Sequence, residues 1–318
     1  METGLRPLSA GTWGRTIGAV LGDRGTGRLG AASWLLAALV GRGHVHKTAL
    51  LVVAVTILVA LGASGDAVPA PAARLRTPRA GKLRVPPPRG VPGSWRLVLN
   101  SQFSGPRLPS DWRTGWLGGG LTAPVNRSER ACYSPANVSF PGDGTMHLDV
   151  KAQVSQCGGL TRRYTGAMVT TDPSDGRDGG GFAYTYGVLE ARVYVPAAGA
   201  RIADWPAIWT DGQSWPADGE DDLMEGLDGA ACFHFHDSLG HPGSCVHRLS
   251  PGWHTFASYW RPGVVTYYYD GARVGAIATG ITAAPMYIAI DNTVSAARGP
   301  ATVADSMRVR YVRVWQHS

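Results

Sequence analysis

Short runs of alternating apolar and polar residues recur along the C-terminal two thirds of the chain. Gly, Pro, Asn and Asp separate these runs, and many of their apolar positions are β-branched or aromatic, which is the pattern of β-strands. The clearest are TMHLDVK (145–151), YGVLEARVYV (186–195), GVVTYYYDG (263–271), PMYIAID (285–291) and SMRVRYVRVW (306–315). No stretch of ten or more residues there has the period of an amphipathic helix. We therefore expect an all-β sandwich or barrel.

The run 186–195 separates its side chains into two faces. Leu, Ala and Val occupy one face, whereas Glu190, Arg192 and Tyr194 alternate with them on the other. A polar face of this kind can form the floor of a cleft, so Glu190 and Arg192 are candidate binding residues. A surface ion pair is the alternative.

The N-terminal part of the chain has the features of an export signal. Residues 49–63 form an apolar run of fifteen residues, which is short for a membrane span of about 20 residues. Lys47 and several Arg residues precede the run and small residues follow it, as in a cleavable signal. We expect residues 1–66 to be a signal peptide and the protein to be secreted. An uncleaved anchor that leaves the rest outside the membrane is the alternative.

Residues 67–94 are rich in Pro and Arg and have few large apolar side chains, so they are expected to form an extended linker. The folded domain would then comprise residues 95–318. The formal charge of +7 belongs to the leader, because residues 1–95 carry +9 and the remainder carries −2. This division argues against nucleic acid as a partner. We expect a monomer.

The four cysteines all lie within the expected domain. An even number in an exported domain favours two disulfides, and we favour the sequence-local pairs Cys132 with Cys157 and Cys232 with Cys245 among the three possible pairings. The segment 232–247 also carries four His residues, so zinc binding by Cys and His is an alternative. It has no CxxC spacing, and we expect no metal.

The segment GEDDLMEG (219–226) places four carboxylates within six positions: Glu220, Asp221, Asp222 and Glu225. Its spacing is not that of a calcium-binding EF-hand loop. An exposed acidic turn is possible, but aromatic residues flank the segment on both sides. In a regular strand Glu220 and Glu225 would face opposite sides, because they are an odd number of residues apart. One β-bulge at Leu223 or Met224 would return Glu225 to the face of Glu220 and Asp222.

Three carboxyl groups on one face suit the hydrolysis of a glycosidic bond with retention. One carboxylate attacks the sugar carbon and another protonates the leaving oxygen, at a separation of about 5 to 5.5 Å. Asp222, between them, could help to keep the nucleophile ionised and the acid protonated.

The segment resembles the ExDxxE signature of glycoside hydrolase family 16, in the bulged form typical of its laminarinase-like and galactan-cleaving branches. Similarity extends over residues 95–318, through WRLVLNSQFSG, YSPANVSF, GTMHLDVKA, YTYGVLEARVYVP, ADWPAIWT, WHTFASYWRPGVVTYYYDG and MRVRYVRVW. The resemblance implies a concanavalin-like β-jelly-roll sandwich of two antiparallel sheets, whose concave face holds an extended polysaccharide.

The resemblance also implies roles for individual residues. Glu220 looks like the nucleophile, Asp222 its assisting carboxylate and Glu225 the general acid/base. Residues similar to the family's sugar-binding side chains are Glu190, Arg192, Trp205, Trp209, His236 and Trp260, and Trp215 is close enough in sequence to join them. Aromatic faces suit sugars because the C–H groups of the ring pack on them. Ordinary core packing is the alternative for each Trp.

Three positions depart from the family pattern. Asp221 stands where an aliphatic residue usually faces the core, and a carboxylate there is unfavourable unless it has a partner or is solvated. Arg310 stands where many members carry an Asp that binds a structural calcium, so we expect no calcium site. The run around Asn126 matches the family's Asn-Glu segment only with extra residues, and Asn126 is left unassigned.

The sequence therefore predicts a secreted, retaining endo-glycoside hydrolase that cleaves β-1,3-glucan or mixed-linkage β-glucan without a cofactor. A β-galactan hydrolase or a transglycosylase on the same fold is one alternative. A carbohydrate-binding sandwich without catalysis is another, and Asp221 is its best support.

Overall fold

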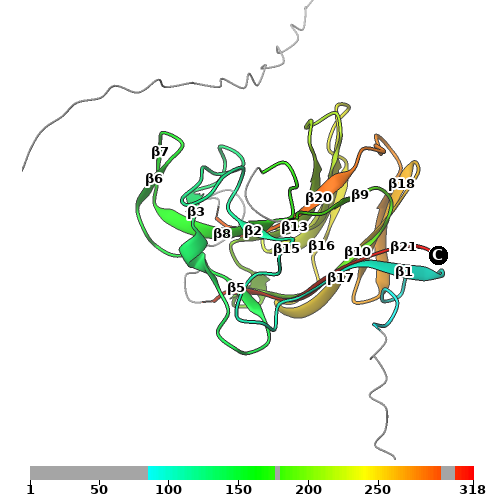
Figure 1. The fold of residues 1–318 in the computed structure, drawn as a ribbon, viewed down its shortest axis with the longest axis horizontal. Helices are drawn as coiled ribbons and strands as arrows, with labels where there is room; N and C mark the ends of the chain where they lie inside the picture. The colour runs from blue at the N-terminus through cyan, green and yellow to red at the C-terminus, as the bar shows by residue number, and fades with distance from the viewer. Residues whose placement is uncertain (1–84, 176–179, 295–304) are drawn as a thin grey trace, which may run out of the picture. The chain divides into compact units, whose positions relative to one another are not determined.

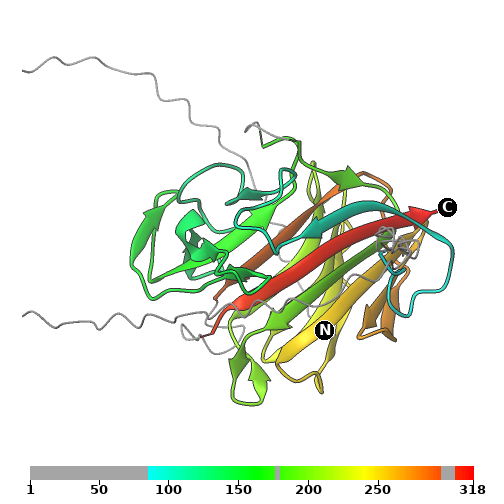
Figure 2. The same ribbon diagram turned by 60° about the horizontal axis from the view of Figure 1, so that its bottom comes forward.

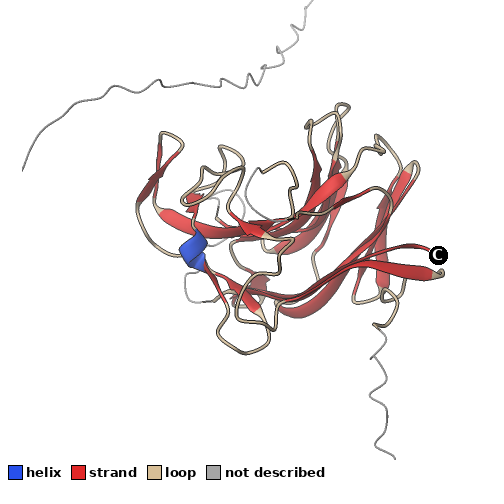
Figure 3. Cartoon of the chain, viewed as in Figure 1, coloured by secondary structure: helices blue, strands red, loops and turns tan. Residues whose placement is uncertain are grey.

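A computed structural model describes residues 85–175, 180–294 and 305–318, and nearly all of the regular structure in them is β-strand (Figure 3). The expected signal segment 1–66, with its apolar run 49–63, lies outside the described residues, as does the linker up to residue 84. Within the part that is described, no helix has the length and apolar character needed to span a membrane.

Two large sheets form the described structure. The larger sheet, called sheet B, has nine strands in the described residues. Its order is β16 (Gly243–Val246), β15 (Ala230–His236), β14 (Glu220–Leu227), β13 (Trp205–Gly212), β20 (Met286–Thr293), β8 (Tyr164–Thr170) and β2 (Arg113–Thr114), with β3 (Ala131–Tyr133) beside β8 and β9 (Ala183–Tyr184) beside β20. Only β3 and β8 pair in parallel among the described strands.

Sheet A has eight strands in the described residues. Its order is β19 (Ala272–Ile277), β18 (Val264–Tyr269), β17 (Gly252–Arg261), β10 (Gly187–Val195), β21 (Met307–His317), β5 (Met146–Leu148) and β4 (Val138–Ser139), with β1 (Trp95–Gln102) beside β21. Figure 2 shows β10, β21 and β1 running side by side. The remaining elements are β6 (Ser155–Cys157), β7 (Leu160–Arg162), β11 (Ala197–Ala198), β12 (Arg201–Ile202) and the 3₁₀ turn η1 (Pro135–Asn137).

The two sheets stack face to face around one apolar core (Figure 1). The alternation in β10 turns Leu189 and Val193 into this core, where buried side chains of sheet B such as Ile208 and Leu223 also lie. Burial of the apolar face of each sheet against the other is the driving force for this arrangement. The fold is a β-jelly-roll sandwich, as the strand pattern and the family resemblance predicted, and each of the five clearest sequence runs overlaps one of its strands.

Two disulfides join neighbouring segments. Cys132 of β3 is bonded to Cys157 of β6, and Cys232 of β15 is bonded to Cys245 of β16. These are the two pairs that the sequence favoured. Because both cysteines of the 232–247 segment are used in a disulfide, they are not zinc ligands in this structure.

The packed structure begins before the expected boundary at residue 95. Val91 is buried on the outer face of sheet A, where it belongs to an apolar cluster with Val188 and Trp315. The backbone N–H of Arg89 donates a hydrogen bond to Oε2 of Glu190 over 2.6 Å. Residues 85–94 therefore belong to the domain rather than to the linker. The sequence did not reveal this because the apolar residues of the segment are few and are separated by Pro and Arg.

Gly90 offers a direct test of this docking. It has a φ of +74°, and a Cβ added to it would lie 2.0 Å from the carbonyl oxygen of Gly271. Gly120 has the same φ of +74°, but a Cβ there would meet nothing within 4 Å. Both Ala variants carry the left-handed backbone strain, and only Gly90→Ala adds a clash.

We expect Gly90→Ala in the full chain to unfold at a midpoint roughly 3 to 10 °C below that of Gly120→Ala, as measured by calorimetry. Equal midpoints for the two variants would show that residues 85–94 do not pack on sheet A.

Candidate active site

The acidic strand β14 departs from a regular ladder at one point. On the side of β15, Glu220 pairs with His236 and Asp222 with His234, and the register then shifts before Glu225. On the side of β13, the register shifts between Ile208 and Trp209. This irregularity lies where the sequence predicted a bulge.

The three carboxylates that the sequence singled out line one cavity. Glu220, Asp222 and Glu225 all contribute to its wall, whereas Asp221 is buried on the opposite side, toward the sandwich core. The cavity has a volume of about 50 Å³. Its other lining residues are Val125, Asn126, Glu129, Tyr133, Trp205, Ala207, Trp209, Asp291 and Thr293.

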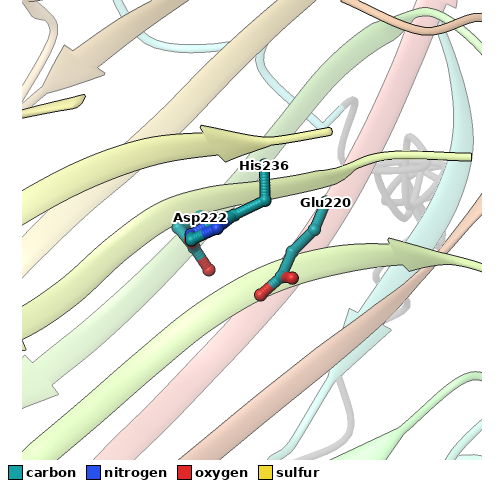
Figure 4. Close-up of side chains that lie close together, drawn as sticks. All are labelled: Glu220, Asp222 and His236. Atoms are coloured by element: carbon teal, nitrogen blue, oxygen red, sulfur yellow. The ribbon is translucent and has the colours of Figure 1, made fainter. Parts of the chain in front are cut away.

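Glu220 and Asp222 each contact a ring nitrogen of a neighbouring side chain. The indole N–H of Trp215 donates to Oε2 of Glu220 over 2.5 Å, and Nε2 of His236 lies 2.9 Å from Oδ2 of Asp222. Figure 4 shows His236 reaching toward Asp222 from the neighbouring strand, with the Glu220 carboxylate beside them. Trp215 is half exposed, so Glu220 lies at the solvent side of the cluster.

Glu225 lies deeper and is held by two ring nitrogens. The indole N–H of Trp205 donates to its Oε1 over 3.1 Å, and Nδ1 of His234 lies 2.8 Å from its Oε2. Asp222 and Glu225 each present a carboxylate oxygen within 4.8 Å of the other and of His234. Asp222 therefore lies close to both of the other carboxylates, since one of its oxygens is also within 4.8 Å of a Glu220 oxygen.

Burial and the repulsion between neighbouring carboxylates raise the pKa values of Glu220 and Asp222. Burial, and next the charge of Asp222, raises the pKa of Glu220 well above its usual value, although His236 and the Trp215 N–H oppose the shift. Burial, and next the charge of Glu225, raises the pKa of Asp222. Carboxylates this close disfavour one another's ionised form, so Glu220 and Asp222 keep their protons to a higher pH than a free carboxyl group does.

A second group of acids in the cavity was missed in the sequence. Glu129 is buried, and its Oε1 accepts hydrogen bonds from the backbone N–H and the side-chain amide of Asn126. Its Oε2 lacks a hydrogen bond of good geometry, although the hydroxyls of Tyr133 and Thr293 are near enough to moderate its pKa. Burial raises that pKa to about 7. The only sequence signal was the unassigned run around Asn126.

Asp291 completes this group. It accepts hydrogen bonds from the indole N–H of Trp209 over 2.8 Å and from the hydroxyl of Tyr133 over 3.2 Å. Burial, and next the charge of Glu129, raises the pKa of Asp291 well above its usual value. The run 285–291 was interpreted only as a strand, so nothing in the sequence pointed to this carboxyl.

The structure does not bring Glu190 and Arg192 to the cavity. Both lie on β10 of sheet A, on the face that points away from the core. The Glu190 carboxylate accepts hydrogen bonds from the Arg89 backbone and the Tyr311 hydroxyl, and Arg192 lies 3.7 Å from Asp270. The two residues therefore lie on the sheet that does not carry the carboxylates, away from the cavity in which they were expected.

Of the four tryptophans that were expected to bind sugar, three lie at the cavity and one lies in the core. Trp205 and Trp209 line the cavity and Trp215 contacts Glu220, as described above. Trp260 instead lies in the core between the sheets, where its ring meets those of Tyr184 and Tyr186 edge to face. Trp260 is therefore a packing residue, which was the alternative for each Trp. Arg310 lies over the ring of Trp253.

Two sets of side chains, each made of two cavity carboxylates and a neighbouring histidine, have the geometry to hold a metal ion. Each set offers three ligand atoms within 4.8 Å of one another, and the sets are Glu220, Asp222 and His236, and Asp222, Glu225 and His234. The same contacts are ion pairs between carboxylates and imidazoles when the histidines are protonated. In that state the positive charges of the histidines partly neutralise the carboxylates without a metal ion.

Comparison with solved structures identifies the fold. No family model matches the sequence, and no curated protein matches it. An endo-acting O-glycanase of the human gut microbiota that initiates mucin breakdown has a TM-score of 0.59 at 23% identity, covering 73% of this chain and 94% of its own. The laminarinase catalytic domain of Thermotoga maritima MSB8 has a TM-score of 0.59 at 21% identity, and the match covers 71% of this chain and 99% of the laminarinase domain.

A third solved structure, the endo-β-1,3-glucanase of Pyrococcus furiosus, has a TM-score of 0.57 at 21% identity and covers 70% of this chain and 95% of its own. At these identities the likeness establishes that the chain shares the fold of these enzymes.

Glu129 gives the stability of the domain a defined pH dependence. Its pKa is raised from 4.5 to about 7 in the folded state, so the folded protein binds a proton that the unfolded chain releases over that range. The free energy of unfolding should therefore fall as pH rises from about 4.5 to about 7, by on the order of 3 kcal/mol from this group.

We expect Glu129→Gln to unfold at a higher midpoint than the native protein at pH 8 and at nearly the same midpoint at pH 4.5. Thermal unfolding at the two pH values measures this difference. Asp111→Asn, in a loop outside the cavity, is the control. The same pH dependence in Glu129→Gln as in the native protein would contradict the burial of an unfavourable charge at this position.

Proposed function

We propose that the domain is a glycoside hydrolase that cleaves the chain of a neutral β-glucan internally and with retention. The observation that carries the proposal is the convergence of Glu220, Asp222 and Glu225 on one cavity that Trp205 and Trp209 also line. The resemblance to glycoside hydrolase family 16 and the shared fold with endo-β-1,3-glucanases support it.

In the first step Glu225, protonated, donates its proton to the glycosidic oxygen while Glu220 attacks the anomeric carbon. The bond from that carbon to the leaving sugar breaks, and a covalent ester with Glu220 forms. In the second step Glu225 removes a proton from water, whose oxygen displaces Glu220. The ring nitrogens of Trp205 and His234 hold the Glu225 carboxyl in place through both steps.

Asp222 adjusts the charge between these two groups. Because Asp222 lies within 4.8 Å of an oxygen on each of them, a proton on Asp222 removes a like charge beside Glu220 and lets Glu220 ionise. His236 contacts Asp222 and supplies a partly compensating positive charge when it is protonated. The cluster can therefore carry a negative charge on Glu220 while Asp222 holds a proton.

The cavity also favours an uncharged substrate. Its described lining residues include five carboxyl groups and neither Lys nor Arg. A sulfated or uronic sugar would find no Lys or Arg partner among these lining residues. Laminarin and mixed-linkage glucan are neutral, and we propose β-1,3-linked or mixed-linkage glucan as the substrate. A neutral β-galactan is the second candidate class, because the bulged signature also resembles the galactan-cleaving branch of the family.

We further propose that the protein acts outside the cell, either secreted or held by residues 49–63. Two disulfides support an oxidising compartment. The apolar run with its preceding basic residues supports export.

The proposal is tested by incubating the full chain with laminarin, mixed-linkage glucan and agarose and measuring reducing ends. We expect Glu220→Gln and Glu225→Gln each to lower the rate on laminarin by at least about a hundredfold. Glu190→Gln, a glutamate variant on the other sheet, should keep the native rate. The newly formed reducing ends should appear first as the β-anomer, as followed by proton NMR.

Other outcomes would contradict the proposal in different ways. Binding of laminarin with no release of reducing ends above the Glu220→Gln level would identify a carbohydrate-binding domain. Cleavage of agarose alone would replace the glucan by a galactan. Release of the α-anomer first would exclude the covalent step at Glu220.

A further inference from the structure

Two tyrosines of β18 reach across the sandwich core to the underside of the acidic strand. Tyr267 and Tyr269 are two residues apart, so their side chains share a face of β18, and both are fully or almost fully buried in the core between the sheets. Tyr268 lies between them and points to the outer face of sheet A, beside Val188 and Ala257. The two inward hydroxyls are polar groups in an apolar core, so their partners matter.

Tyr269 meets the strand at its irregularity. Its hydroxyl lies 3.1 Å from the carbonyl oxygen of Leu223 in β14 and 3.1 Å from that of Cys232 in β15. These carbonyls flank the point where the ladder between the two strands loses its register, between Asp222 and Glu225. A bulge interrupts the ladder locally, and buried carbonyls need a donor. The Tyr269 hydroxyl is a donor that both carbonyls can share.

Tyr267 meets the strand two residues earlier. Its hydroxyl donates to Oδ1 of Asp221 over 2.7 Å and lies 3.1 Å from the carbonyl oxygen of His234. Asp221 is wholly buried, and burial raises its pKa to about 6, although the Tyr267 hydrogen bond opposes the shift. Its neighbours in the chain, Glu220 and Asp222, face the cavity on the other side. Fixing the Asp221 side chain therefore fixes the backbone from which both carboxylates project.

We propose that Tyr267 and Tyr269 are positioning residues for the cavity carboxylates. Tyr269 holds the bulge that turns Glu225 into the cavity, and Tyr267 holds Asp221 and thereby the backbone of Glu220 and Asp222. Each hydroxyl contacts both β14 and β15, which carry the carboxylates and their histidine partners. For its catalytic readout the inference rests on the proposed glycosidase function, and a second readout is independent of that function.

The tyrosines can be tested by removing only their hydroxyls. Tyr267→Phe and Tyr269→Phe in the full chain keep the ring in the core, and Tyr268→Phe is the matched control on the outer face of the same strand. On laminarin we expect the two inward variants to lower kcat by about tenfold or more with KM within about twofold, because the carboxylates lose their alignment. Tyr268→Phe should match the native enzyme.

The second readout is the indole N–H resonances of two tryptophans in a ¹H–¹⁵N spectrum. Trp205 donates to Glu225 and Trp215 donates to Glu220, so each resonance reports the position of one carboxylate. We expect Tyr269→Phe to move the Trp205 resonance, Tyr267→Phe to move the Trp215 resonance, and Tyr268→Phe to move neither.

The outcomes separate the two hypotheses. If the native chain cleaves no polysaccharide, the proposed function fails, while the resonances still decide whether the tyrosines position the carboxylates. If both inward variants keep the native resonances and kcat and lower only the unfolding midpoint, the hydroxyls serve stability alone and the inference is overturned. Spectra of a variant that does not fold would lack dispersion, and the other inward variant then provides the test.

Discussion

The candidate site depends on a one-residue irregularity in the pairing of β14 with its neighbours. Without it, the pleat would point Glu225 into the core and leave only Glu220 and Asp222 on the cavity side. The register shift places Glu220, Asp222 and Glu225 on the wall of the cavity and leaves Asp221 facing the core between the sheets. The roles proposed for the three acids follow from that placement, since it brings oxygens of Glu220 and Glu225 within 4.8 Å of Asp222.

Such a cluster is stable only because the sandwich supplies partners on both faces of the strand. On the cavity side, indole and imidazole nitrogens contact the acids, and Glu225 is held between two of them. On the core side, the hydroxyls of Tyr267 and Tyr269 contact Asp221 and the backbone of the bulge. The raised pKa values of Glu220 and Asp222 show that these partners do not fully offset the burial of charge. Buried groups with perturbed pKa values of this kind are typical of functional sites, which is the basis for proposing one here.

Sequence patterns predicted the parts of this structure that depend on local spacing. Glu220 and Glu225 are an odd number of residues apart, which predicted a bulge in the strand, and the runs of alternating residues indicated a β-sandwich. Alternation placed Glu190 on a polar face correctly but could not say to which sheet that face belongs, because sheet membership depends on long-range pairing. An aromatic residue such as Trp260 has the same local pattern in a cleft and in a core. Glu129 joins the cavity from a loop, where no periodicity marks its direction.

We propose that the irregular strand presents Glu220 as a nucleophile to a bound glucan. A 2-deoxy-2-fluoro-β-laminaribiosyl fluoride would trap that nucleophile. The fluorine at C2 slows both steps through their oxocarbenium-like transition states, while the fluoride leaving group at C1 still lets the covalent ester form. Mass spectrometry of the digested protein should then find one labelled site, in the peptide that carries β14, at Glu220. A label on any other carboxylate, or turnover of glucan by a protein that this reagent never labels, would contradict the account.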